Sequence, residues 1–465
     1  MLKKPDTLKK SVYLSLFLLF FALTGSAQNS ASIYGTVINR NSQAPLAGIT
    51  VTLSPDSVST LSDSAGAFRF ENIAPGSYNL TFSGVGFQPK TQANVVVTTG
   101  NISTLNIELE ETVKELSNIT ITGTRSTARA ATLESPLSIQ RLTTEEIKAN
   151  PGGNFDISRV IQSLPGVGGG AGGGSFRNDI VIRGGSPTEN VFYLDGIEVP
   201  VINHFSTQGS SGGPQGILNV SFIEEVKLST SAFDARYDNA LSSVFQFRQK
   251  TGNPNRLQGN VRLSGTEVAA TLDGPLSKNT TFLFSARRSY LEFLFKLIDL
   301  PIRPNYWDFQ AKTTTKLNDK TTLSFLGIGA IDEFRFAAPK EATPEKLYAI
   351  SSSPNINQWT YTFGATLRRL INNGYWNLSL SRNTLDNTVD KFSDNQNPRE
   401  EERTLLIRSN ETENKLRFDV TKNTNNWKIS YGLVSQYVQF DNRYEQVFRP
   451  ELRDDQGNII QNKVE

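Results

Sequence analysis

Alternation between apolar and polar residues dominates the second half of the chain. Between residues 307 and 317 the odd-numbered positions carry aromatic or aliphatic residues or threonine, and the even-numbered positions carry charged residues, glutamine or threonine. The same alternation recurs over residues 359–367. A strand of this kind can place one face against lipid and the other against water. The pattern predicts eight strands, which start near Leu257, Thr280, Asn305, Thr321, Gln358, Tyr375, Glu411 and Trp427.

The predicted connections between these strands differ greatly in length. Residues 318–320 and 371–374 form tight turns, whereas residues 337–357 and 390–409 are long and polar. Short turns on one side and long loops on the other are typical of an outer-membrane barrel. A soluble β-sandwich, which is the alternative, would have connections of more even length. The pattern therefore indicates part of an antiparallel transmembrane β-barrel over residues 253–465.

A different cadence marks the first hundred residues. Five short β-branched and aromatic runs occupy residues 33–38, 49–53, 67–70, 78–82 and 94–97. Turn residues separate them, and this spacing predicts a small β-sandwich over residues 28–112. The stretches GTVINRNSQAPLAGITVTL and SDSAGAFRFENIAPGSYNLTFSGVGF resemble the carboxypeptidase regulatory-like domain that precedes many exported receptors. We expect this domain to be a binding or spacer module.

The amino terminus has the pattern of a secretory signal peptide over residues 1–27. Four lysines precede an apolar run at residues 12–23, and Gly25, Ser26 and Ala27 follow it. The apolar run is shorter than the ~20 residues of a spanning helix, which argues against the alternative of a membrane anchor. Cleavage is predicted between Ala27 and Gln28, and the mature chain is therefore expected outside the cytoplasm.

Composition excludes several kinds of function. The formal net charge of +2 becomes −1 when a leader with four lysines and one aspartate is removed, so we expect no nucleic-acid partner. The chain has no cysteine and one histidine, His204. A zinc carboxypeptidase needs two histidines and a glutamate around its metal, so we predict no enzyme activity, no metal and no cofactor. A lone histidine such as His204 is more often a surface or packing residue than a ligand contact.

A short helix and a glycine-rich stretch follow one another in the middle of the chain. A short helix around residues 156–163 would present Ile157, Val160, Ile161 and Leu164 on one face, and Pro165-Gly166 ends it. The glycine-rich residues 166–174 do not form a phosphate cradle, because no strand runs into them, no helix begins on them and no Gly-Lys-Ser/Thr follows. We predict a loop there.

Two motifs further on carry the most specific resemblance in the chain. The stretches NDIVIRGGSPTENVFYLDGIEV and GILNVSFIEEVKLSTSAFDARYDNALSSVFQFRQK are similar to the plug domain of TonB-dependent outer-membrane receptors, and residues 130–252 are assigned to it. The usual final glycine-rich turn of the family is replaced here by residues 239–245. Tight turns are expected at Gly184, Gly185 and Gly196. Charges that could pair with the barrel wall are Arg183, Asp195, Glu224 and Glu225.

The linker at residues 113–129 contains a segment that resembles a TonB box. This segment consists of Ile119, Thr120, Ile121, Thr122 and Gly123. A short extended segment can add as a strand to the edge of a partner sheet, mainly through main-chain hydrogen bonds. The resemblance implies that a TonB-type energy-coupling complex of the inner membrane grips it. The alternative is an ordinary linker strand.

The predicted fold class is mainly β, with a small β-sandwich, then an α/β plug domain, then a partial barrel. Eight strands enclose only their own side chains, whereas transporters with about 22 strands hold a plug. We therefore expect the chain to be the first part of a longer barrel.

The resemblance implies a function in the outer membrane, among its lipids. It implies active import of a scarce ligand (a siderophore, vitamin, glycan or peptide), with siderophore uptake as the family's default. Two alternatives stay open. One is a small closed barrel with a structural or adhesive role, and the other is a receptor that relays a signal through its amino-terminal domain.

Overall fold

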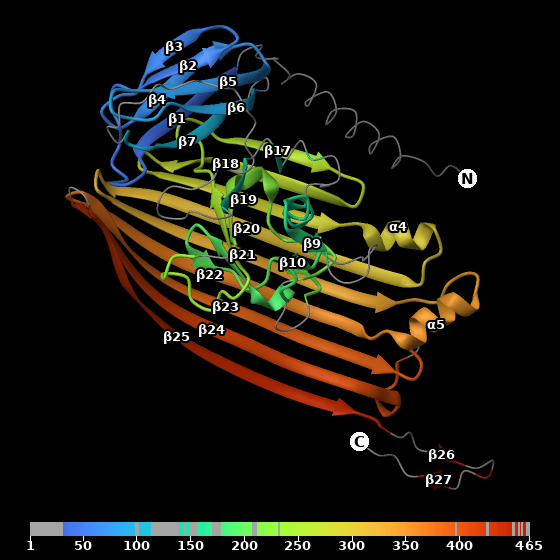
Figure 1. The fold of residues 1–465 in the computed structure, drawn as a ribbon. Coiled ribbons are helices and arrows are strands. Elements are labelled where there is room, and N and C mark those ends of the chain that lie inside the picture. Colours follow the sequence, from blue (N-terminus) through green and yellow to red (C-terminus); the bar gives the residue numbers. More distant parts are fainter. Residues whose placement is uncertain are drawn as a thin grey trace, which may run out of the picture. The chain divides into compact units, whose positions relative to one another are not determined.

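The computed structural model describes residues 31–97, 102–112, 139–143, 146–147, 150, 156–169, 178–206, 212–230, 233–395, 398–424, 427–448, 452–453, 456 and 459–461 (Figure 1). The predicted cleavage site at Ala27 and Gln28 lies outside the described residues, and so does the segment from Ile119 to Gly123. Contacts divide the chain into two compact units, with a boundary at residues 113 and 114.

The first unit is a two-sheet β-sandwich, as predicted. One sheet has the order β4-β1-β7 and the other the order β3-β2-β5-β6. Every second residue of β1 is buried, because alternate side chains of a strand point to opposite faces. The strands are β1 (Ala31–Asn39), β2 (Thr50–Ser54), β3 (Val58–Leu61), β4 (Ala67–Ile73), β5 (Gly76–Ser83), β6 (Lys90–Val97) and β7 (Ile102–Leu109).

The second unit begins with an α/β domain, which we call the plug. Its central sheet has the order β12-β11-β16-β15-β8, and β11 pairs with β16 in parallel. The Asp156 side chain caps α3, whose buried residues lie in the core of the plug. The elements are β8 (Ile139–Thr143), α3 (Ile157–Ile161), β9 (Val167–Gly169), β10 (Ile180–Ile182), η1 (Pro187–Glu189), β11 (Asn190–Leu194), β12 (Ile197–Glu198), β13 (Asn203–His204), β14 (Gln215–Gly216), η2 (Val220–Phe222), β15 (Ile223–Thr230) and β16 (Ser243–Gln249).

A large antiparallel sheet, which we call the wall, follows the plug. In the described part of the chain it has nine strands in sequence order. Helices α4 (Leu291–Leu297) and α5 (Pro344–Ser352) lie in connections at one end of the sheet (Figure 1). The strands are β17 (Gln258–Leu263), β18 (Glu267–Ser277), β19 (Thr280–Ser289), β20 (Ile302–Asn318), β21 (Thr321–Phe336), β22 (Asn355–Ile371), β23 (Gly374–Phe392), β24 (Arg403–Thr424) and β25 (Trp427–Gln446). A separate pair, β26 (Leu452–Arg453) and β27 (Ile459–Gln461), comes last.

The prediction of eight strands was wrong by one, because β18 was missed. Its apolar residues are interrupted by Asp273, Gly274 and Pro275, a sequence that favours a turn. Here these residues continue the ladder and pair with β19. The predicted polar connection at residues 390–409 was also too long, since β23 runs to Phe392 and β24 starts at Arg403.

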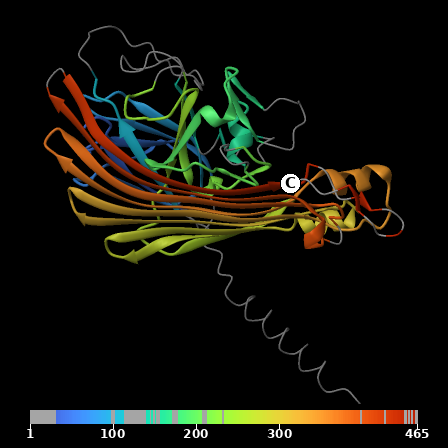
Figure 2. The same cartoon turned by 90° about the horizontal axis from the view of Figure 1, so that it is seen from below.

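The alternation predicted for β20 and β22 is confirmed. On β20, Trp307 and Phe309 are exposed and stack with their ring centroids 6.0 Å apart, while Asp308 and Gln310 are buried on the other face. The sheet is curved, and the plug lies on its concave side (Figure 2). Among the described residues, no helix is long and apolar enough to cross a membrane.

Candidate functional site

The plug contacts the wall partly through apolar residues. Leu326, Ile328 and Ala330 of β21 are buried in the same cluster as the core residues of the plug. On β22, Gly364 lies close to Ile197 of the plug. A Cβ atom at position 364 would lie 2.3 Å from Cδ1 of Ile197, so a larger residue there would force the Ile197 side chain to shift.

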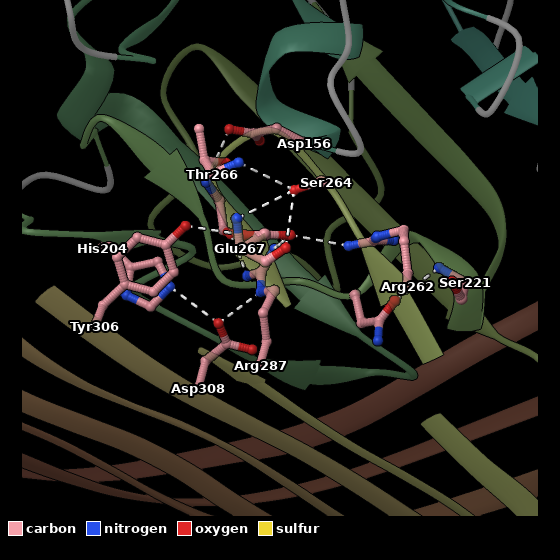
Figure 3. A network of polar contacts seen from close by, with 12 residues as sticks. Asp156, His204, Ser221, Arg262, Ser264, Thr266, Glu267, Arg287, Tyr306 and Asp308 are labelled. Atoms are coloured by element: carbon pink, nitrogen blue, oxygen red, sulfur yellow. Dashed lines mark hydrogen bonds and ion pairs between the residues drawn. The ribbon is translucent and has the colours of Figure 1, made fainter. Parts of the chain in front are cut away.

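A buried polar cluster, which we call the seam, forms the second contact (Figure 3). It consists of His204, Arg262, Glu267, Arg287, Tyr306, Asp308 and Asp332. His204 Nδ1 lies 2.6 Å from an oxygen of Asp332, and Nε2 lies 3.1 Å from an oxygen of Asp308. The ring stacks on Tyr306 with centroids 4.0 Å apart. The backbone N–H of Phe205 donates to the other oxygen of Asp332 at 2.8 Å. Because both ring nitrogens face carboxylates, both carry protons, and His204 is an imidazolium.

Arg287 of β19 links the wall to the plug beside His204. Its Nε donates to Asp308 at 2.7 Å, and its Nη1 lies 3.4 Å from Glu267. Its Nη2 donates to the backbone oxygen of Gly216 in the plug. Figure 3 shows the guanidinium between the two carboxylates. The hydroxyl of Tyr306 also donates to Glu267, at 2.9 Å. A plug backbone group is therefore tied to the wall through a fully buried cation.

The charges of the seam balance only when His204 is protonated. The three carboxylates are those of Glu267, Asp308 and Asp332, and the three cations are His204, Arg262 and Arg287. All but Arg262 are at most 4% exposed at their side chains. Buried ions are tolerated when they are paired, and removal of one partner destabilises strongly, by about 3–5 kcal/mol. A neutral His204 would leave one carboxylate without compensation.

The surroundings of His204 raise its pKa. Burial by itself lowers the pKa, but the negative charges of Asp332 and Asp308 and their hydrogen bonds outweigh this and raise the pKa to about 9. The ordinary value for an unfolded chain is about 6.5. The charged form is therefore favoured in the folded protein at neutral pH.

We expect the seam to weaken in alkali. A group whose folded pKa is raised contributes stability that is fully present below its unfolded pKa and is lost as the pH rises through its folded pKa. The contribution of His204, up to about 3 kcal/mol, should therefore be complete near pH 6.5 and disappear above about pH 9. The measurement is the melting temperature of the wild-type protein and of a His204→Gln variant from pH 6 to 10. The difference should shrink as the pH rises, and a constant difference would contradict the assignment.

Further polar contacts join the two parts away from His204. Asp195 of the plug pairs with Lys312 of β20 at 2.8 Å and accepts hydrogen bonds from Gln249. The backbone N–H of Asn219 donates to Gln310 at 2.9 Å. On β24, Lys415 pairs with Glu198 and with Asp238. The contact between plug and wall is therefore lined by charge pairs along several strands.

The structure places the plug residues proposed from sequence in three different settings. Arg183 and Gly184 form a turn after β10, and Asp195 and Gly196 form one between β11 and β12. All four have positive φ angles, between 48° and 86°. The turn at Asp195 and Gly196 places the Asp195 carboxylate against Lys312 of the wall.

The remaining three residues lie elsewhere in the plug. Gly185 gives room to its neighbours, since a Cβ there would lie 2.6 Å from the hydroxyl oxygen of Ser242. Glu224 and Glu225 form ion pairs with Arg248 of β16, at 3.3 and 3.7 Å. These two pairs lie within the plug, and the pairing of Glu224 and Glu225 with the wall stays a prediction. The final turn of the domain uses Asn239 with φ 58°, a conformation that asparagine tolerates better than most residues.

His204 is not a surface residue, and sequence reasoning missed its partners. The side chain is fully buried, so the part of the expectation that placed it in packing is the correct one. Asp308 does stand on the inward face of an alternating strand, and so does Arg287 on β19. A charged residue on the inward face of an alternating strand was therefore the sequence signal that could have identified the partners of His204. Within the described ranges no group of three His, Cys, Asp or Glu side chains could hold a metal ion.

Comparisons with known proteins match both units. The family model described as "TonB-dependent Receptor Plug Domain" matches residues 131–244, and the one described as "Carboxypeptidase regulatory-like domain" matches residues 32–110. The TonB-dependent transporter Oar of Myxococcus xanthus is 24% identical over 301 residues, which cover 57% of this chain and 27% of Oar. The chain contains the plug domain of TonB-dependent receptors. The seam thus joins this plug domain to the strands of the wall.

Solved structures of outer-membrane and siderophore receptors are similar to this chain in fold. The pyoverdine outer membrane receptor FpvA of Pseudomonas aeruginosa has a TM-score of 0.51 and 13% identity, over 68% of this chain and 49% of FpvA. The siderophore receptor PirA of Acinetobacter baumannii has a TM-score of 0.48 and 14% identity, over 65% of this chain and 48% of PirA. The chain spans about half the length of these receptors and about a quarter of the length of Oar.

Proposed function

We propose that this receptor imports a scarce ligand across the outer membrane by a TonB-dependent mechanism. The observation that carries the proposal is the seam, where a plug core residue and several wall strands meet through paired charges. A plug inside a polar lumen needs such partners, whereas a permanent protein core is better stabilised by apolar packing. Charge pairs can also be exchanged for water when the plug moves. No covalent chemistry is required for this function.

The outer face of the wall supports a location in the outer-membrane lipid. Trp307, Phe309, Trp359 and Phe363 are 40–53% exposed on the face that points away from the plug. Exposed aromatic and aliphatic side chains on one face of an antiparallel sheet suit contact with lipid. The predicted signal peptide would bring the chain to the periplasm first.

The energy for import would come from the periplasmic side. We propose that Ile119 to Gly123 form the segment that a TonB-type complex of the inner membrane binds as an added strand. A pull on this segment is applied to the chain just before β8 of the plug. Force would thus reach the plug sheet directly.

A siderophore is the ligand class that we propose to test first. FpvA is a pyoverdine receptor, and PirA is a siderophore receptor. Vitamins, glycans and peptides are the other classes that this family imports, and they belong in the same panel. The panel is a set of growth media, each with one compound as the limiting source of iron, cobalamin, carbon or nitrogen. The panel ligand is the compound on which a strain that carries the receptor grows faster than a strain from which the receptor gene is deleted.

Ile121→Pro tests the energy-coupling segment. Proline removes one backbone donor from a strand that pairs by main-chain hydrogen bonds. We expect uptake of the panel ligand to fall to the level of the deletion strain, while binding of that ligand to intact cells is retained. Ser126→Pro, in the same linker but outside the segment, is the control and should leave uptake unchanged. Unchanged uptake in Ile121→Pro would remove the assignment of this segment.

A further inference from the structure

A cavity of about 250 Å³ lies between the plug and strands β22 to β25. It is distinct from the seam, whose wall residues come from β17 to β21. Both apolar and polar residues of the plug line it, and the residues that the wall contributes are polar except for Leu385. The residues that matter here are Val191, Glu198, Val201, Asn383, Glu411 and Glu413.

Asn383 points to a missing hydrogen-bond donor in this cavity. The residue is 5% exposed, and its amide nitrogen donates to Glu413 at 3.4 Å. Its amide oxygen is buried and has no hydrogen-bond partner among the described residues. The opposite orientation of the amide would turn that oxygen toward the Glu413 carboxylate and is disfavoured. An unpaired buried acceptor is costly, so the cavity is built to receive a donor.

The charges of the side chains that line the cavity favour a positively charged donor. Three carboxylates, those of Glu198, Glu411 and Glu413, line the cavity, and no Lys, Arg or His is among its described lining residues. Lys415 is nearby and pairs with Glu198 and Asp238, so the charge of Glu198 is already compensated. The carboxylate that the donor would meet beside Asn383 is that of Glu413. Hydrogen bonds from a charged donor to a carboxylate are about twice as strong as neutral ones.

The side chains that line the cavity also favour an organic cation over a metal ion. In the described parts of the chain no three acidic side chains are arranged to hold a metal. Val191 and Val201 instead give one side of the cavity an apolar surface. An alkyl stem can lie along such a surface while its charged end reaches the carboxylates.

We infer that this cavity binds an ammonium or guanidinium group on a short aliphatic stem, carried by the ligand that passes between plug and wall. The inference rests on the proposed import function, because the cation is taken to belong to the imported ligand. Binding of the cation in the cavity can nevertheless be measured on the receptor alone. It names the chemical class of ligand, namely one with a protonated amine or guanidine.

The test uses butylguanidinium as the probe and neutral butylurea as its isostere. Both are titrated calorimetrically into the full-length receptor purified in detergent, without the energy-coupling partner. Butylguanidinium should bind at least tenfold more tightly than butylurea. Equal binding of the two compounds, or no binding of butylguanidinium, would overturn the inference. Neither result depends on uptake, so a failure of the import proposal is seen separately, as uptake that does not respond to Ile121→Pro.

Three variants place the probe in the cavity. Asn383→Leu removes the acceptor at similar volume and should weaken butylguanidinium binding at least tenfold. Asn383→Asp keeps an oxygen there and adds negative charge, so it should bind the probe more tightly than the wild type does. A purely structural role for Asn383 predicts no such tightening. Asn414→Leu, on the opposite face of β24, is the control. Equal loss in Asn383→Leu and Asn414→Leu would overturn the assignment.

Discussion

A receptor with Ile197→Cys and Gly364→Cys should lose all uptake of the panel ligand until the disulfide is reduced. A Cβ atom at Gly364 would lie 3.1 and 3.3 Å from Cγ1 and Cγ2 of Ile197. The two Cβ atoms of the cysteines would therefore be roughly 4 Å apart, which suits a disulfide. The substitution at position 197 also removes the Cδ1 atom with which a side chain at position 364 would collide. The chain has no other cysteine, so the cross-link would be unambiguous.

The reason for this loss is that the cross-link ties the plug to the wall covalently. Import requires the plug to move relative to the wall, and a pull from the periplasm cannot break a disulfide. Ile197→Cys alone should transport normally with or without reductant, and the double variant should recover when reductant is added. Undiminished uptake by an oxidised double variant, with the cross-link verified by mass spectrometry, would show that this part of the plug does not move.

Arg287→Met should destabilise the docked plug by about 3–5 kcal/mol. The substitution keeps much of the length of the side chain but leaves Asp308 and Glu267 buried with one fewer cation. It also leaves the backbone oxygen of Gly216 without its donor. The measurement is the denaturant midpoint at which the plug becomes sensitive to protease in the purified receptor.

Arg288→Met is the matched control for this variant. Arg288 is the next residue of β19 and lies over the ring of Trp307, 4.9 Å from its centroid, on the outer face of the wall. Loss of a partly exposed cation–π contact should cost at most about 1 kcal/mol. If the two variants shift the midpoint equally, Arg287 has no special role in holding the plug.

The strands of the wall could be predicted because their signal is local. Alternation with a period of two is visible within ten residues, as over 359–367, and it does not depend on the partner strand. The strand β18 was not predicted because its Asp-Gly-Pro sequence is typical of a turn. In the structure, pairing with β19 on one side and with β17 on the other keeps this segment extended. In the sandwich, β3 escaped because it has four residues and little burial, so no apolar face marks it.

The seam could not be predicted, because its pairs join distant parts of the sequence. His204 lies 104 residues from Asp308 and 128 from Asp332. Sequence alone shows a histidine in a loop-like stretch and some inward charges on strands, and nothing in their spacing says which of them meet. The turns at Gly184 and Gly196 were more accessible, since a glycine after a strand is itself a signal for positive φ.

The most direct test of the account is whether uptake needs energy. Cells that carry the receptor are given the labelled panel ligand with and without a protonophore that collapses the inner-membrane potential. The account predicts that binding to the cell surface persists while accumulation stops, because a plug held by the buried seam does not leave its place without a pull. Accumulation that continues at the same rate in the presence of the protonophore would contradict TonB-dependent import.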